Sequence, residues 1–296
     1  MFSVVIPTYN RTRVVANSIN SVLNQTFQDF EIIVVDDGSD DIRELRDIVS
    51  SFGDNRIVLI EHKENRNGSA ARNTGIDNAK FEFVLFLDSD DIWPPTRLEL
   101  ALQNINSCDS DLLCKTVFYG RVRRTASIDS ASYKTLPVRG KGRDERVGDY
   151  LFIFNGVMQT STIMCHISVA KMVKFDEALR RHQDYDFCLR AEANGMIFSY
   201  TDALVSYWIN DDAPTTIESV DFRYLWIKRS RKYLSEEAYN AYLVSLVMPF
   251  AFRDKKYVLG TKILLLSFYR CPNFVYLNAL KRLPNILKSK PAKRKH

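Results

Sequence analysis

The stretch FVLFLDSDD, residues 83–91, has five apolar residues that are followed directly by a group of three carboxylates. A short and wholly apolar run predicts a strand buried on both faces, as in a parallel sheet. Open sheets of that kind bind ligands at the carboxyl ends of their strands. Neighbouring carboxylates repel one another unless a cation compensates them, and their hard oxygen atoms suit Mg²⁺ or Mn²⁺. The stretch therefore predicts an α/β sheet with a metal-bound diphosphate at the end of one strand.

The residues before this stretch repeat the strand pattern. Short buried strands are expected at residues 4–7, 31–36, 56–61 and 83–87. Apolar residues at helical spacing lie between the strands, and another helix is expected after Pro94 and Pro95. Strands that alternate with helices predict a mainly parallel, right-handed, doubly wound sheet.

After residue 108 the pattern is less regular. Strands are expected at residues 112–119, 161–165, 196–200 and 204–209, and helices at 148–155 and 184–194. Gly195 is typical of a helix C-terminus, because glycine adopts the left-handed conformation without strain. The polar segment 125–146 predicts a loop, and the chain from residue 217 onward is expected to be helical. We therefore divide the chain into residues 1–108, 109–216 and 217–296.

The composition is that of an ordinary globular protein, with 46% hydrophobic and 26% charged residues among 296. The five cysteines are scattered and form no CxxC pair, which argues against a disulfide framework or a zinc site and indicates a reducing cytoplasm. The N-terminus begins as a strand, so no signal peptide is expected. The apolar segments 243–252 and 257–269 are shorter than the roughly 20 residues of a membrane span. These features predict a cytoplasmic protein that is soluble or peripheral.

The C-terminal third combines aromatic and basic residues. The segment 281–296 holds seven lysines and arginines and no acidic residue, within a chain of net charge +5. This mixture is typical of helices that lie on an anionic membrane surface. It also suits nucleic acid, but no RNA-binding signature is present and we expect no nucleic-acid partner. The plainer alternatives are a solvated terminus and a helical core.

Polar residues also follow the first of the predicted strands, in the segment PTYNR, residues 7–11. Tyr9 has the ring to stack on a base, and the Arg11 guanidinium suits phosphate oxygens. The alternative is that Tyr9 belongs to the core and that Arg11 is a surface charge. The segment alone does not decide between these roles.

Two further segments have the chemistry to contact a nucleotide. Asp36 and Asp37 end the second predicted strand, where acidic side chains can accept from a base or a ribose, although DGS is also favoured turn chemistry. Small residues at 67–75 begin a helix and let the backbone approach a ligand, with Arg72 suited to phosphate. This segment matches neither GxGxxG nor GxxxxGK[ST], so the sequence supports neither a Rossmann cofactor nor a P-loop.

In this order, the segments resemble the inverting glycosyltransferases of family 2, which have the GT-A fold, and are similar to bacterial O-antigen and capsule enzymes. The resemblance covers about the first 210 residues, at segments 4–11, 35–39, 67–75, 86–91 with Trp93 and Pro94, 159–161 and 183–186. It implies an α/β GT-A domain with a C-terminal helical extension. Residues 1–108 would then be the nucleotide-sugar-binding half, 109–216 the acceptor-binding half, and 217–296 the basic extension.

The resemblance also implies roles for single residues. The UDP-sugar donor would be bound by Pro7, Thr8, Tyr9, Asn10, Arg11, Asp37, Arg72, Asp88 and Ser89. Asp88 and Asp90 would form the DxD motif that holds Mn²⁺ or Mg²⁺, and Asp91 is a further candidate ligand. Gln159 and Thr160 would line the acceptor site.

An inverting transfer needs a base that takes the proton of the attacking hydroxyl, and the resemblance assigns this role to Asp184. The family has a Glu-Asp pair at this point, whereas this chain has Gln183 before Asp184. Asp186 is the rival carboxylate. Alternatively, Asp184 is a helix N-cap, worth about 1 kcal/mol, or the acids form a structural charge cluster with Arg190.

The resemblance thus implies a metal-dependent inverting hexosyltransferase of bacterial polysaccharide or lipopolysaccharide biosynthesis. The sugar would pass from a UDP-sugar to a hydroxyl of a glycan acceptor linked to undecaprenyl diphosphate, at the inner face of the cell membrane. One alternative is a sugar-1-phosphate nucleotidyltransferase, which needs a glycine-rich basic loop where this chain has PTYN, residues 7–10. A second alternative is a non-catalytic sugar-nucleotide-binding module. A third is a glycoside hydrolase, and that enzyme would need neither metal nor nucleotide.

Overall fold

A computed structural model describes residues 1–209 and 219–288 of the chain. The chain forms two compact units. The sheet unit comprises Met1–Gly140 and Val157–Asp211, and the helical unit comprises Lys141–Gly156 and Asp212–His296. Residues 141–156, which the sequence analysis assigned to the part 109–216, thus group with the C-terminal helices. The functional roles of the three sequence-defined parts stay predictions.

Four parallel strands begin the sheet unit, in the order β3-β2-β1-β4. They are β1 (Phe2–Thr8), β2 (Phe30–Asp36), β3 (Ile57–Glu61) and β4 (Phe83–Phe86). The helices α1 (Thr12–Leu23), α2 (Ile42–Ser51) and α3 (Gly68–Asn78) connect them. The predicted mainly parallel α/β sheet is confirmed. One detail was wrong: β3 is only half-buried, because it lies at the edge of the sheet.

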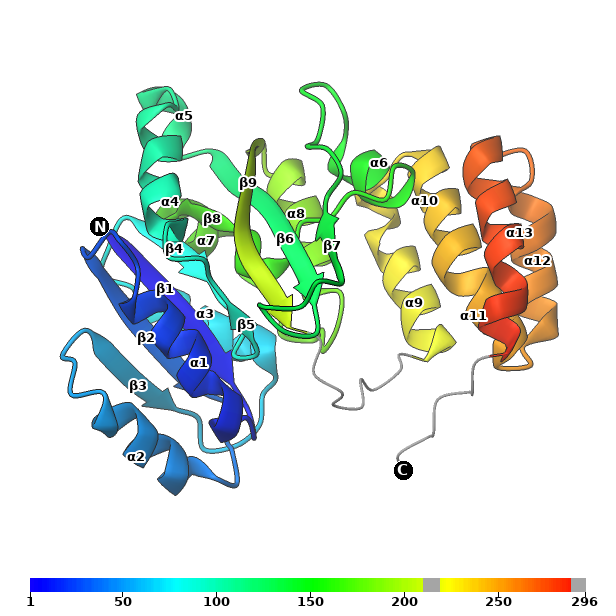
Figure 1. Ribbon diagram of the computed structural model, residues 1–296. Coiled ribbons are helices and arrows are strands. Elements are labelled where there is room, and N and C mark those ends of the chain that lie inside the picture. The colour runs from blue at the N-terminus through cyan, green and yellow to red at the C-terminus, as the bar shows by residue number, and fades with distance from the viewer. Residues whose placement is uncertain (210–218, 289–296) are drawn as a thin grey trace. The chain divides into compact units, whose positions relative to one another are not determined.

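The sheet continues beyond β4 with strands of mixed direction and varied length (Figure 1). They are β8 (Met164–His166), β6 (Thr116–Thr125), β9 (Ile197–Ile209), β5 (Asp91–Ile92) and, paired with β6, β7 (Tyr133–Leu136). β8 runs antiparallel to both β4 and β6, whereas β6 and β9 are parallel. The helices of this part are α4 (Arg97–Asn106), α5 (Ser110–Leu113), α7 (Ile167–Val173) and α8 (Gln183–Ala193).

This second part departs from the sequence predictions in several places. The segment 125–146 contains β7, whose exposed Tyr133 and Lys134 lack the apolar alternation that predicts a strand. The two strands expected at 196–200 and 204–209 are one strand, β9, with register shifts near Gly120 of β6. The strand expected at 112–119 begins later, after α5, and the one at 161–165 is preceded by the 3₁₀ turn η1 (Thr160–Thr162).

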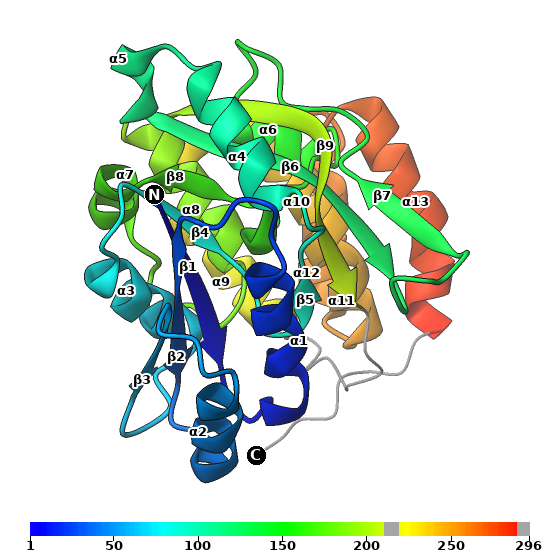
Figure 2. The ribbon, with the colours of Figure 1, turned by 60° about the vertical axis from the view of Figure 1, so that its left-hand side comes forward.

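Helices cover both faces of the parallel strands, as Figure 2 shows for α1 and α3 around β1 and β2. Val4 and Ile6 pack in the larger core on one face, and Ile33 packs with Ala71 of α3 on the other. A Cβ atom on Gly75 would lie 2.3 Å from Cγ1 of Val5, so only glycine lets α3 approach β1 this closely. This close packing fixes the position of α3, which carries Arg72 one turn earlier.

The helical unit contains the predicted C-terminal helices, over the part of the chain that is described. They are α6 (Val147–Phe152), α9 (Val220–Ser230), the 3₁₀ turn η2 (Arg231–Tyr233), α10 (Glu236–Tyr242), the π-helical turn η3 (Leu243–Val247), α11 (Met248–Arg253), α12 (Tyr257–Ser267) and α13 (Asn273–Lys288). The ring of Phe152 lies 6.2 Å from that of Trp226 and 5.0 Å from that of Tyr242. These aromatic contacts explain why α6 belongs to this unit.

Within residues 1–209 and 219–288, no helix combines the length and the apolar character that crossing a bilayer requires. This finding concerns membrane-spanning helices only, and the expected peripheral attachment stays a prediction. Half of the basic segment 281–296, from residue 289 onward, lies outside the described residues.

Candidate active site

The predicted segments meet where the order of the strands reverses. From β1 the chain moves through α1 to β2 on one side, and α3 later brings it back to β4 on the other side of β1. Such a switch point is where open α/β sheets bind ligands. Arg11, after β1, forms an ion pair with Asp90, after β4. Residues far apart in the chain thus converge on one edge of the sheet.

The carboxylates after β4 have two different environments. The side chains of Asp88 and Asp90 are 27% and 28% exposed, and pair with Arg72 and Arg11 respectively. Asp91 is buried, and one of its oxygens, Oδ2, accepts hydrogen bonds from Gln159 and Ser161. Burial, together with the charges of Asp88 and Asp90, raises the pKa of Asp91 well above its usual value. Arg72 and Arg11 therefore offset part of the negative charge of Asp88 and Asp90, and the predicted metal ion stays a prediction.

Ser161 anchors the turn that presents these acids. Its hydroxyl donates to Oδ2 of Asp91 over 2.5 Å and accepts from the backbone N–H of Asp88 over 3.0 Å. Its carbonyl accepts the indole N–H of Trp93 over 2.9 Å. Ser161 was not among the predicted site residues. The signal was its place in the segment 159–161 of the family resemblance.

The predicted acceptor residues lie beside this turn. Gln159 Nε2 donates to Oδ2 of Asp91 over 2.6 Å. Thr160 begins η1 and is 5% exposed, and its carbonyl accepts from the N–H of Ile163. Their contacts to an acceptor stay predictions.

Asp184 is the second residue of α8, after His182, which has a left-handed backbone (φ 60°) at the N-cap. Asp184 is therefore not the N-cap, which excludes the capping alternative. Its Oδ1 accepts the N–H of Tyr185 over 2.9 Å, and it forms no ion pair with any described residue. Burial, and to a lesser degree the charge of Asp88, raises the pKa of Asp184. A carboxylate with a raised pKa is suited to proton transfer near neutral pH.

The rival carboxylate, Asp186, has a structural role. Its Oδ2 accepts from Nε of Arg190 over 2.6 Å, and the same guanidinium donates to the carbonyl of Lys174 over 2.7 Å. The predicted charge cluster thus exists between Asp186 and Arg190, and Asp184 is outside it. This arrangement favours Asp184 over Asp186 as the base.

Arg72 connects the acids after β4 with the start of α8. It is 6% exposed, pairs with Asp88, and donates through Nη1 to Oε1 of Gln183 over 2.6 Å. Gln183 in turn donates to the carbonyl of Leu179 over 2.7 Å. The neutral amide at this position therefore accepts a hydrogen bond that a glutamate would also accept. The departure from the family's Glu-Asp pair leaves this link to Arg72 intact.

Aromatic packing holds α8 against β4. The rings of Phe175 and Phe187 stack with centroids 4.8 Å apart, and Phe86 lies edge-on to both. Phe86 ends β4 just before the acids, and Phe187 lies one turn after Asp184 on α8. The end of β4 and the start of α8, which carry the two groups of carboxylates, thus pack against the same aromatic cluster.

Asp37 is buried within a hydrogen-bond network of its own. It interacts with Nδ1 of His62 over 2.9 Å and accepts from Nδ2 of Asn65 and the N–H of Arg66, both over 2.9 Å. The other ring nitrogen of His62 lies 2.8 Å from the hydroxyl of Thr74. Sequence reasoning missed His62, because a single histidine after a strand carries no pattern. The network fixes the orientation of the Asp37 carboxylate.

The remaining predicted donor residues end β1 or lie shortly after β1 and β4. Pro7 and Thr8 are buried. Tyr9 is 44% exposed, which excludes the alternative that its ring belongs to the core. Asn10 has a left-handed backbone, and its N–H donates to Oγ of Ser39 over 2.8 Å. Ser89 is buried, and its carbonyl accepts from Ser18 over 2.9 Å. Their contacts to a donor stay predictions.

The residues of the site fit a divalent ion that is shared with a substrate. No group of three or more His, Cys, Asp or Glu residues able to hold a metal occurs at positions 1–209 or 219–288. Mg²⁺ is often bound through one or two carboxylates together with substrate phosphates. Asp88 and Asp90 offer two such carboxylates.

Residues 3–164 match the sequence profile of Glycosyl transferase family 2. The chain belongs to this family. The match contains the ends of β1, β2 and β4 and stops at residue 164, where β8 begins. Membership in glycosyltransferase family 2 also argues against the nucleotidyltransferase and glycoside hydrolase alternatives.

Two curated glycosyltransferases are similar to this family 2 chain. The amylovoran biosynthesis glycosyltransferase AmsB of Erwinia amylovora is 33% identical over 253 residues, which are 83% of each protein. The UDP-Glc:alpha-D-GlcNAc-diphosphoundecaprenol beta-1,3-glucosyltransferase WfgD of Escherichia coli is 38% identical over 102 residues, which are 34% of this chain and 40% of WfgD. Both relatives are bacterial.

Among solved structures, residues 1–349 of S. aureus TarS in complex with UDP-GlcNAc have the same fold as this family 2 chain. The TM-score is 0.68 at 19% sequence identity, over 97% of this chain and 89% of that one. The predicted GT-A fold with a C-terminal helical extension is thereby confirmed.

Proposed function

We propose that this protein transfers a sugar, with inversion, from a UDP-sugar to a hydroxyl of a lipid-linked glycan during bacterial polysaccharide biosynthesis. Asp184 is the base, Asp88 and Asp90 hold Mn²⁺ or Mg²⁺ together with the donor diphosphate, and Gln159 and Thr160 contact the acceptor. The observation that carries the proposal is the position of Arg72, which contacts both Asp88 and Gln183, the neighbour of Asp184. The Arg72 side chain thus connects the aspartates proposed to bind the leaving diphosphate with the segment that carries the proposed base.

The two groups of acids have the properties that this reaction requires. The base must accept a proton from the acceptor hydroxyl, and the raised pKa of Asp184 makes its carboxylate a stronger base. Inversion follows from one in-line attack on the anomeric carbon, through an oxocarbenium-like transition state. Arg11 and Arg72 lie beside the acids that face the diphosphate, so they can bind its oxygens. A bound Mg²⁺ or Mn²⁺ would act as a Lewis acid and stabilise the charge of the departing UDP.

The printed names of the relatives support the choice of donor and acceptor. WfgD uses UDP-Glc and a GlcNAc-diphosphoundecaprenol acceptor, TarS was crystallised with UDP-GlcNAc, and AmsB belongs to amylovoran biosynthesis. We therefore extend UDP-sugar, hexosyl transfer and an undecaprenyl-diphosphate-linked acceptor to this chain. Such an acceptor is anchored in a membrane, which supports a peripheral location at the inner face of the cell membrane.

The proposal is tested by measuring UDP release from a panel of UDP-sugars, with a lipid-diphosphate glycan acceptor and with Mn²⁺, Mg²⁺ or EDTA. We expect one donor to be used, with turnover abolished by EDTA and reduced on the order of 10²-fold or more in Asp90→Ala, because the metal stabilises the leaving group by several kcal/mol. Asp47→Ala is the matched control, since Asp47 is exposed on α2 and remote in sequence from the acids. Its activity should equal that of the wild type.

Two results would contradict the proposal. Turnover that persists in EDTA and in Asp90→Ala would exclude the metal role, while leaving sugar transfer intact. Binding of UDP-sugars without turnover on any acceptor would instead identify a non-catalytic binding module. The anomeric configuration of the product, measured by NMR, decides whether the transfer inverts.

A further inference from the structure

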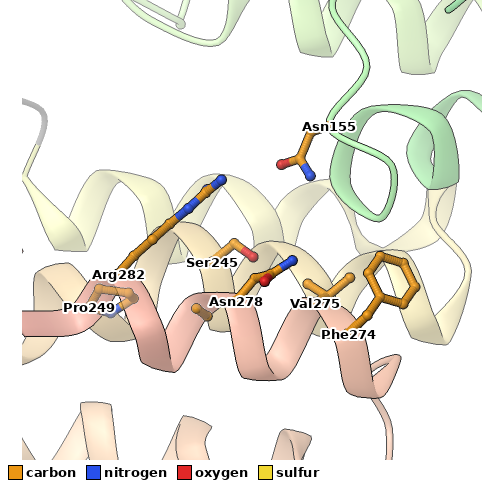
Figure 3. A pocket seen from close by; sticks show the side chains of 8 residues that line it. Asn155, Ser245, Pro249, Phe274, Val275, Asn278 and Arg282 are labelled. Carbon is orange, nitrogen blue, oxygen red and sulfur yellow. The ribbon is translucent and has the colours of Figure 1, made fainter. Parts of the chain in front are cut away.

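The helical unit contains a cavity of about 350 Å³ between α9, α10 and α12. Its volume falls within the range of small-molecule sites, which starts at roughly 300 Å³. A second hollow in this unit, lined by Asn155, Ser245 and Arg282 among others, has only about 20 Å³ (Figure 3). That space suffices for about one water molecule. The larger cavity is therefore the candidate for a ligand.

Basic side chains dominate the charge of the cavity. Lys228, Arg231, Lys262 and Arg270 line it, against one carboxylate, Glu236. Glu236 pairs with Arg231 and lies 3.7 Å from Arg270. Lys228 and Lys262 form no ion pair with any described residue, and Lys228 lies 5.5 Å from the ring of Tyr224. The cavity thus has positive charge left over for an anionic ligand.

Apolar side chains form another part of the lining. Leu243, Leu259, Ile263 and Leu266 contribute to the same cavity. An anion that is only a small, fully hydrated ion gains nothing from such walls. A ligand that combines a phosphate with a hydrocarbon chain satisfies both parts of the lining.

An exposed apolar stripe on α12 adjoins the cavity. Val258 is 86% and Leu265 68% exposed, and Tyr269, just after the helix, is 91% exposed. The two α12 residues are seven apart, so they lie on one face of the helix, with Lys262 between them. Lys262 and the half-exposed Leu266 also line the cavity. Apolar side chains in water beside basic residues are typical of helices that bind membrane surfaces.

We propose that this cavity binds the phosphate of an anionic membrane phospholipid. Lys228 and Lys262 contact the phosphate, and the acyl chains lie along Leu266 and the exposed stripe of α12. The charge of the cavity and its apolar lining together favour a lipid over a free anion. This inference deepens the peripheral membrane location in the proposed function and rests on it.

The test is flotation of the full chain with vesicles of phosphatidylcholine, alone or mixed with phosphatidylglycerol. We compare the double variant Lys228→Gln/Lys262→Gln with Lys232→Gln/Lys281→Gln, which removes two exposed lysines of the same unit outside the cavity. Each basic residue at an anionic surface contributes about fivefold to binding, so the cavity variant should lose about 30-fold in partitioning. The control variant should lose less than about fivefold, because its lysines do not contact the bound phosphate.

A second pair of variants tests the apolar stripe. Val258→Ser/Leu265→Ser should bind the mixed vesicles several-fold less, whereas Leu225→Ser, which changes a 65% exposed leucine on α9, should bind as the wild type does. Unchanged vesicle binding of the stripe variant would show that the acyl chains do not lie along the exposed residues of α12.

Three other outcomes would overturn the inference. Equal losses of vesicle binding in the two lysine variants would show that binding depends on the net charge of the protein and not on the cavity. Release of the protein by inorganic phosphate, but not by chloride at the same ionic strength, would assign the cavity to a free anion. Absence of wild-type binding to either kind of vesicle would overturn the membrane location as well, whereas UDP release with a soluble acceptor analogue would still test glycosyl transfer on its own.

Discussion

The acids at the end of β4 and the acid at the start of α8 differ in their partners, although all are aspartates of one site. Asp88 and Asp90 are each paired with an arginine at the edge of the sheet. Asp184 has no ion-pair partner among the described residues, and burial raises its pKa. Paired carboxylates are suited to a charged ligand, whereas a partly buried carboxylate without an ion pair is suited to a proton. The environment of each aspartate, rather than its residue type, thus separates the two proposed roles.

Asp184→Asn should have the largest effect on this comparison. Loss of a general base lowers turnover by about 10²–10⁴-fold, which the UDP-release assay measures. Its stability should rise at neutral pH. Folding raises the pKa of Asp184, so between the unfolded and folded pKa values the folded state binds more protons than the unfolded state. The free energy of unfolding of the wild type therefore falls as pH rises through that interval. Asparagine removes that cost, and the gain should disappear below about pH 4, where unfolded aspartate is protonated.

Asp186→Asn is the matched control on the same helix. It breaks the ion pair with Arg190, so it should lower the free energy of unfolding, with a smaller loss of turnover than Asp184→Asn. If Asp186→Asn loses turnover as fully as Asp184→Asn does and remains folded, the assignment of the base to Asp184 is wrong.

Arg72→Met tests the link between the two groups of acids. It leaves Asp88 and Gln183 without their partner, and should cost about 2 kcal/mol of unfolding free energy, less than the 3–5 kcal/mol of a fully buried pair, since Asp88 is partly exposed. The KM for the donor should also rise. Chemical denaturation and initial rates measure the two effects.

Arg46→Met is its control, because it removes the exposed ion pair of Arg46 with Glu61. Such surface pairs contribute little to the free energy of unfolding, because solvent screens them. Equal destabilisation by the two variants would show that Arg72 does no more than a surface arginine.

Gln183→Glu should have the smallest effect. A negative charge next to Asp184 raises its pKa further, so the acid limb of the pH–rate profile should move to higher pH. Arg72 contacts this position and offsets part of the new charge, so a shift of less than about one pH unit is expected. Gln103→Glu adds the same charge at an exposed position of α4 and should leave the profile unchanged. A shift to lower pH would contradict the environment described for Asp184.

The accuracy of the sequence predictions follows the kind of burial. β1, β2 and β4 are wholly buried, and they were predicted within two residues because a short, uninterrupted apolar run between turn residues is typical of a strand covered on both faces. β7 has exposed and half-buried residues, and it was missed because its backbone pairing with β6 leaves no apolar pattern. The helix α6 was predicted, but its place among the C-terminal helices depends on contacts of Phe152 with residues more than 70 positions away.

The sequence alone determined the α/β class, the parallel strands and the family, because these depend on local runs and on short motifs that follow them. The tertiary structure decided which acids are paired. Arg11 reaches Asp90 across 79 positions, and Arg72 reaches Gln183 across 111. The pKa of Asp184 likewise depends on the desolvation that packing imposes. Ion pairs and burial are properties of neighbours in space, and the chain order of residues does not contain those distances.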